Sequence, residues 1–185
     1  LAVIRFSARV AGTVEICDNG IDEDGDGLID LADPDCQAAG PVKKCEGVSV
    51  DGKILQGVDA GETLTGTQKS DEVRGRGGND NIVGLEQSDC LFGNKGNDTI
   101  NGDEGNDVIR AGSDKDNVSG GDGDDNIKLQ FGDDKVDGGP GDDKIKAQAK
   151  GVDHVNCGSG EDRVIGDQKD SINRNCEHVK IVDPA

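Results

Sequence analysis

The chain has 185 residues and is strongly acidic, because 39 Asp and Glu against 20 Lys and Arg give a net charge of -19. Such a charge argues against binding to nucleic acid or to anionic membranes and favours cations as ligands. No run of about 18 apolar residues is present, so no membrane-spanning segment is expected. With only three aromatic residues and 30 glycines, the composition approaches that of a disordered chain. A fold must therefore depend on periodicity and bound cations.

The six cysteines predict disulfides and an oxidising, extracellular setting, since the apolar core is small. Zinc is the competing explanation, but the chain has no C-x-x-C pair, and His154 and His178 are not spaced like zinc-finger ligands. A chain that begins at Leu1 without Met is what either a processed exported protein or a trimmed one would show.

Residues 1–11 alternate between apolar and polar side chains, which predicts a half-buried β-strand. Ala2, Ile4, Phe6, Ala8 and Val10 share its apolar face. The strand either covers the fold of its own subunit or adds to the sheet of a neighbouring subunit.

Residues 17–36 form an acidic segment between Cys17 and Cys36, which are the natural disulfide pair. From Asp22 the spacing of carboxylates and of Gly27 resembles an EF-hand-type loop. No helix is expected before it, so the acidic loops of thrombospondin type 3 repeats are the nearer resemblance. The resemblance implies calcium held by side chains and one backbone carbonyl, that of Leu28. The implied ligands are Asp22, Asp24, Asp26, Leu28, Asp30 and Asp33.

Asp33 departs from the EF-hand pattern, because Glu normally stands at that position. The alternative for the whole segment is a solvated acidic loop. With a short linker at residues 38–42, the chain divides into an N-terminal segment, 1–42, and a second domain, 43–185. Residues 43–56 are expected to begin the first coil of that domain, with Val48, Val50 and Ile54 as strand residues.

A repeat of nine residues organises the second domain. Its aspartates are Asp71, Asp80, Asp89, Asp98, Asp107, Asp116, Asp125, Asp134 and Asp143. A branched aliphatic follows each aspartate by two positions: Val73, Ile82, Leu91, Ile100, Ile109, Val118, Ile127, Val136 and Ile145. Glu62 and Leu64 form a weaker copy, and one inserted residue moves the pattern to Asp153 and Val155.

Each unit predicts a six-residue turn followed by a three-residue strand. Only the middle side chain of such a strand points inward, because successive residues alternate faces. Two units form an 18-residue coil with a strand on each side, and neighbouring coils lie about 4.8 Å apart. The fold class is therefore all-β, a solenoid with a thin aliphatic core.

The units resemble the RTX, or haemolysin-type, calcium-binding repeat G-G-x-G-x-D-x-U-x from about Gly57 to Ile165. The resemblance implies a right-handed parallel β-roll, in which turn aspartates and carbonyls of neighbouring coils hold rows of calcium ions. The alternative is that the aspartates only form turns. Stacked carboxylates without cations would repel one another strongly, however.

Alternate units stack on the same edge, so the turns form two columns. The implied calcium ligands are Asp80, Asp98, Gly102, Asp107, Gly120, Asp122, Asp125, Gly138, Asp143 and Asp162. The turns that open at Gly66 and Gly84 lack the inner glycine, which makes calcium there doubtful. Ala111, Lys115 and Leu129 weaken the pattern in the other column.

The C-terminal residues are expected to cap the roll, as a solenoid requires. Residues 170–172 are an irregular copy of the repeat, and residues 175–182 are expected to close the end. Cys157 and Cys176 are about one coil apart and are predicted to pair. Cys45 and Cys90 either pair with each other or link subunits.

One outer face is predicted to carry a basic stripe, composed of Arg74, Phe92, Arg110, Lys128 and Lys146. The stripe is either a solvated face that balances nearby carboxylates or a docking surface. The partner would then be an acidic glycan or the acidic edge of another subunit.

No sequence signature of an active site is present, so the chain is predicted not to be an enzyme. The leading hypothesis is an extracellular calcium-binding structural protein, a homo-oligomer or self-assembling subunit of a surface layer, matrix or filament. The alternative is a calcium-dependent folding, secretion or adhesion module of a larger exported protein. The six cysteines weaken that alternative, because RTX proteins exported in one step usually lack cysteine.

Overall fold

The computed structural model describes residues 44–182, with the exception of residue 46 and of residues 148–149. The predicted strand at residues 1–11, the acidic loop from Asp22 to Asp33 and the Cys17–Cys36 pair all lie outside the described residues. These three features remain predictions.

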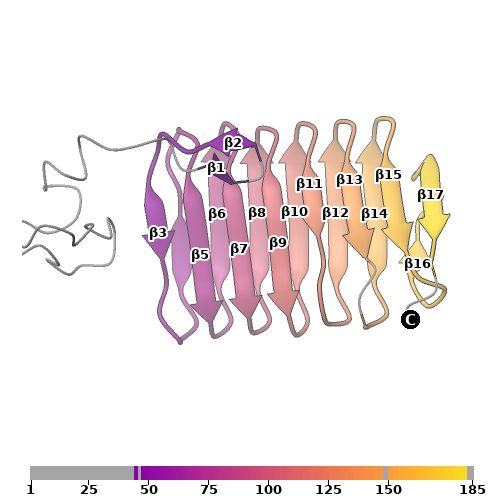
Figure 1. Cartoon of the computed structure of the whole chain (residues 1–185), viewed down its shortest axis with the longest axis horizontal. Coiled ribbons are helices and arrows are strands. Elements are labelled where there is room, and N and C mark those ends of the chain that lie inside the picture. The colour runs from indigo at the N-terminus through magenta and orange to yellow at the C-terminus, as the bar shows by residue number, and fades with distance from the viewer. Residues whose placement is uncertain (1–43, 46, 148–149, 183–185) are drawn as a thin grey trace, which may run out of the picture. The chain divides into compact units, whose positions relative to one another are not determined.

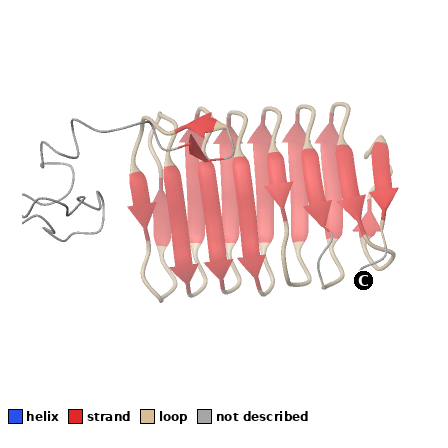
Figure 2. Ribbon diagram, in the orientation of Figure 1, coloured by secondary structure: helices blue, strands red, loops and turns tan. Residues whose placement is uncertain are grey.

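The described residues form an all-β solenoid, a roll with two parallel sheets on opposite sides (Figures 1 and 2). The odd-numbered strands form one sheet, which faces the viewer in Figure 1: β3 (Ile54–Gln56), β5 (Glu72–Gly77), β7 (Cys90–Lys95), β9 (Val108–Ser113), β11 (Asn126–Lys128), β13 (Lys144–Ala147), β15 (Arg163–Gly166) and β17 (His178–Ile181). The even-numbered strands form the other: β4 (Thr63–Thr65), β6 (Asn81–Glu86), β8 (Thr99–Glu104), β10 (Asn117–Asp122), β12 (Lys135–Pro140), β14 (His154–Ser159) and β16 (Ser171–Ile172). We call them the odd sheet and the even sheet.

The strand register confirms the 18-residue coil. Val118 pairs with Ile100 on one side and Val136 on the other, and the inserted residue then moves the partner of Val136 to Val155. Eight of the seventeen described strands have six residues, not the three predicted, because the first residues of their turns also pair with the neighbouring coil. Gly121, for example, stands in register with Asp103.

The core consists mainly of two stacks of aliphatic side chains, one residue from each nine-residue unit, with a few further side chains beside them: Ala111, Leu129, Ala147, Cys157 and Cys176. The stacked aliphatics, from Val73 through Ile145 to Val164, are 0–3% exposed. Leu55, Leu64 and Ile172 are partly buried against the outer ends of the stacks. Because each fully buried aliphatic contributes only about 1.5–3 kcal/mol, a core of one side chain per nine residues is thin.

A short hairpin lies against the odd sheet near the start of the roll. Its strands are β1 (Lys44–Cys45) and β2 (Val48–Ser49), which pair antiparallel. The Cys45–Cys90 disulfide joins the hairpin to β7, so these cysteines pair within the chain. Cys45 packs with Cys90, Val108 and the partly buried Val48 and Phe92.

The first coil differs in detail from the prediction. Val48 and Ile54 are strand residues, but Val50 is buried just outside β2. The inward side chain of β3 is Leu55, which pairs with Val73 and packs against the core. Ile54 takes the preceding, outward position.

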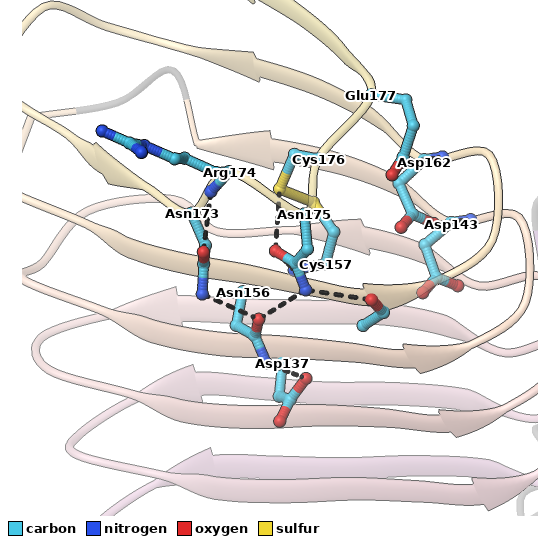
Figure 3. The surroundings of a disulfide bond; sticks show 11 residues. Asp137, Asp143, Asn156, Cys157, Asp162, Asn173, Arg174, Asn175, Cys176 and Glu177 are labelled. Atoms are coloured by element: carbon cyan, nitrogen blue, oxygen red, sulfur yellow. Dashed lines mark hydrogen bonds between the residues drawn. A yellow bond between two sulfur atoms is a disulfide. The ribbon is translucent and has the colours of Figure 1, made fainter.

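The last coil is fastened by the predicted Cys157–Cys176 disulfide (Figure 3). The amide of Asn175 donates to the Asn156 side chain at 2.8 Å and to the Gly158 carbonyl at 2.9 Å. Residues 171–172 form β16 as an irregular repeat, and β17 extends the odd sheet by pairing with β15. All four residues of β17 are exposed, so this strand ends the odd sheet without covering it.

Candidate metal centre

The turn aspartates form two ladders, one along each edge of the roll. One carboxylate oxygen, Oδ1, accepts the backbone N–H of the aspartate one coil earlier; the Asp107 N–H donates to Asp125 Oδ1 at 2.8 Å, for example. The first ladder contains Asp71, Asp89, Asp107, Asp125, Asp143 and Asp162, and the second Asp80, Asp98, Asp116, Asp134, Asp153 and Asp170. The aspartates are therefore fixed in position by the same register that aligns the strands.

The second carboxylate oxygen, Oδ2, has no hydrogen-bond partner in nine of these turns. All nine aspartates are 0–3% exposed. They are Asp80, Asp89, Asp98, Asp107, Asp116, Asp125, Asp134, Asp143 and Asp162. A buried acceptor without a partner costs about 1–3 kcal/mol, and more when it is charged. Nine of them in two rows indicate that another group satisfies them.

Six of the nine oxygens point at a glycine that opens the turn. A methyl group on Gly102 would overlap both Asp107 Oδ2 and the Gly120 carbonyl oxygen of the next coil. The same pairing of a carboxylate oxygen with a carbonyl oxygen occurs beside Gly75, Gly84, Gly93, Gly120 and Gly138. Both oxygens are acceptors, so neither can satisfy the other, and a bound cation is a group that would attract both.

At the two ends of the roll, the aspartate Oδ2 atoms accept hydrogen bonds from protein groups. Asp71 Oδ2 accepts from the Thr67 backbone N–H and, at 2.9 Å, from the Thr67 hydroxyl. Asp170 Oδ2 accepts the Asp167 N–H at 2.7 Å. These protein donors occupy the oxygens that are unpartnered in the central coils, so the end turns can form without a metal.

Three of the nine turns with an unpartnered Oδ2 open with a residue other than glycine. Ala111, Leu129 and Cys157 stand at this position in the turns of Asp116, Asp134 and Asp162, and their side chains join the buried core. In these three turns a side-chain carbon therefore stands beside the carboxylate, where the six glycine turns have no side chain.

Burial raises the pKa of these carboxyls, and neighbouring carboxylates raise most of them further, although the N–H bond to Oδ1 opposes the shift. The pKa rises to about 8 for Asp116 and Asp125, to about 7 for Asp89, Asp143 and Asp153, and to about 6 for Asp98 and Asp107. The pKa values of Asp80, Asp134 and Asp162 are also raised. Without cations, ionising these carboxyls therefore costs more free energy in the folded roll than in the unfolded chain.

The donor set fits a hard cation that accepts carbonyl ligands. Within the described residues, no three Asp, Glu, His or Cys side chains converge on one point. A metal would therefore combine carboxylate oxygens with backbone carbonyls of adjacent coils. Calcium accepts six to eight oxygens of both kinds in flexible geometry, whereas zinc prefers nitrogen and sulfur.

The structure places the predicted ligand residues in three groups. Asp80, Asp98, Asp107, Asp125, Asp143 and Asp162 all carry an unpartnered oxygen, and Gly102, Gly120 and Gly138 open three of the glycine turns. Asp122 is exposed, and its carbonyl accepts the Gly105 N–H at 2.8 Å. The role of these residues as ligands remains a prediction.

Asp89, Asp116 and Asp134 were not among the predicted ligands, although each has an unpartnered oxygen. Asp89 also lies beside a turn-opening glycine, Gly84. Its turn lacks the inner glycine, and Gln87 adopts the required positive φ of 67° in its place. The nine-residue period was the signal that could have included these aspartates.

The family model of the RTX calcium-binding nonapeptide repeat matches the chain in four copies, at residues 56–91, 84–118, 92–127 and 111–145. The roll is an RTX β-roll. Its repeats bind calcium, and the buried aspartate rows agree with that chemistry. Neither the search of curated proteins nor the search of solved structures gave a significant match. The described part of the RTX roll contains no helix long and apolar enough to cross a membrane.

Proposed function

We propose that the protein is an extracellular structural protein, a subunit of a surface layer, matrix or filament that calcium makes rigid. The observation that carries the proposal is the combination of nine unpartnered buried carboxylates with a core of one aliphatic per repeat. The protein interior alone cannot offset the entropy of ordering such a chain. Bound cations would supply the missing stability.

The chain's own residues define how this would work. Carboxylate Oδ2 atoms would bind calcium beside the six turn-opening glycines, together with carbonyls such as those of Gly120 and Gly138. Calcium would contribute positive charge between the stacked carboxylates and link one coil to the next. The coils could then no longer separate independently.

Two disulfides support an extracellular setting, because such bonds persist in oxidising compartments. RTX calcium-binding repeats are also typical of exported proteins. Extracellular calcium is abundant, so sites of modest affinity would stay loaded there. The chain would be unfolded or only partly folded before export, and it would become rigid afterwards.

Electron microscopy of the native protein in calcium, and after chelation, tests the proposal. The expected result is an ordered layer, filament or network with calcium and its loss after chelation. Discrete single molecules at every protein concentration in calcium would contradict the structural role and favour a module that acts within a larger exported protein.

A further inference from the structure

The C-terminal half of the odd sheet presents a cationic surface. The outward positions of β11, β13, β15 and β17 carry no carboxylate. Their cations are Lys128, Lys144, Lys146, Arg163 and Lys180, of which all but the partly buried Lys146 are exposed. We call these five residues the cationic face. On a protein of net charge -19, their separation from the acidic residues is unexpected.

The arrangement costs stability within the monomer. Lys128 stands directly beside Lys146 in the strand register, and Lys144 beside Arg163, so like charges face each other across strands. Within the described residues, Lys128, Lys144 and Lys146 form no ion pair, whereas Arg74 pairs with Glu72 at 2.6 Å. Rows of unpaired like charges therefore have no stabilising role inside the roll.

The even sheet carries the opposite charge in its N-terminal half. Glu86, Glu104 and Asp122 follow one another in register on β6, β8 and β10. With Asp103 they line a shallow hollow of about 550 Å³. We call these four residues the acidic face. Its carboxylates, like the cations of the odd sheet, repeat once per coil, at about 4.8 Å.

We propose that the cationic face of one copy docks on the acidic face of a second copy. The two faces share the coil spacing because they belong to the same repeat, so their charges can match over several coils without adjustment. The β1–β2 hairpin covers part of the odd sheet at β7 and β9, where Cys45 and Val48 pack. A second roll therefore has room beyond β9, where the cationic face begins.

The contact uses different surfaces on the two partners, so it does not close into a dimer. After each docking step the growing assembly still exposes one free cationic face and one free acidic face, so association continues into an open polymer. Each calcium ion bound adds two positive charges, so loading lowers the net negative charge that keeps copies apart. This contact rests on the proposed structural role and would explain why assembly depends on calcium.

Charge reversal of each face tests the contact. One variant carries Lys128→Glu and Lys146→Glu, and the other carries Glu86→Lys and Glu104→Lys. Each alone should associate on the order of tenfold more weakly than the unchanged protein, measured by sedimentation in calcium at low salt. An equal mixture of the two should associate again, because both junctions between unlike copies are then complementary.

A matched control reverses two exposed turn lysines, Lys115→Glu and Lys150→Glu, and should associate like the unchanged protein. Circular dichroism in calcium confirms that every variant is folded. The proposal is refuted if the mixture stays dissociated, or if the control associates as weakly as the face variants. It is also overturned if the protein stays monomeric in calcium but binds an anionic polysaccharide through Lys128 and Lys146.

The same experiment separates this contact from the wider function. Polymers that form in calcium and are unaffected by either charge reversal would support the structural role but contradict docking through the two faces. Monomers at all concentrations would contradict both proposals.

Discussion

Replacing Asp125 by Asn should change stability in opposite directions with and without calcium. Asp125 is 2% exposed, its Oδ1 accepts the Asp107 N–H, and its Oδ2 has no partner. Asn is isosteric and keeps an acceptor for the N–H bond, but it carries no charge. The variant should therefore stabilise the calcium-free roll and destabilise the calcium-loaded one.

The magnitude follows from the pKa of Asp125, which burial raises from 3.8 to about 8. In the unfolded chain this carboxyl has its ordinary pKa of 3.8, about three units below pH 7, so it is ionised there. Folding at pH 7 must therefore restore the proton, at a cost of up to about 4 kcal/mol. Asn avoids that cost. In calcium the sign reverses, because the variant loses a charged ligand, and a site loaded at 100 times its Kd contributes about 2.7 kcal/mol.

The assay is urea unfolding followed by circular dichroism, with calcium and with a chelator, in a sucrose buffer that keeps the metal-free roll folded. Asp71→Asn is the matched control in the same ladder, because Thr67 already donates to Asp71 Oδ2. The control should lose about 1–3 kcal/mol in both conditions. Equal destabilisation of the Asp125 variant with and without calcium would refute the reasoning.

Three further outcomes are expected. In chelator and the same sucrose buffer, stability should fall as the pH rises from about 4 to about 8, because folded-state pKa values of about 6 to 8 lie above the unfolded value of 3.8. Urea midpoints against pH measure this fall. Gly123→Ala should lower the stability of the calcium-loaded roll by about 3 kcal/mol or more in thermal unfolding, since φ is +135° and the methyl group would overlap the Gly105 carbonyl. Gln87→Gly should instead raise the stability by up to about 1 kcal/mol, because glycine adopts the φ of 67° at this position without strain. Cys157→Ser with Cys176→Ser should free the last coil and cost about 3 kcal/mol, seen as faster amide exchange in β17 than in β9. A flat pH profile, a neutral Gly123 variant or unchanged exchange in β17 would each contradict its prediction.

Much of the roll could be predicted because the repeat is local. Asp107, for example, predicts a turn, and Ile109 predicts an inward strand position two residues later. The strand lengths were underestimated, because residues such as Gly121 have no strand preference and pair only through the neighbouring coil. Leu55 was not recognised as the inward residue of β3, since the pattern fades where the first coil begins.

The sequence alone determined the period, the inward aliphatics and the two columns of turns, because each depends on residues nine or eighteen positions apart. Only the tertiary structure decided which carboxylates have protein donors and which have none. Asp71 and Asp125 occupy the same place in their repeats, yet Thr67 satisfies the first and nothing in the described chain satisfies the second. The sequence also predicted the basic stripe that includes Lys128 and Lys146, which the strand register confirms, but the separation of charge onto two opposite faces was decided by the fold. Its physical reason is that the coil returns each strand to the same sheet after 18 residues, which brings distant side chains into one row.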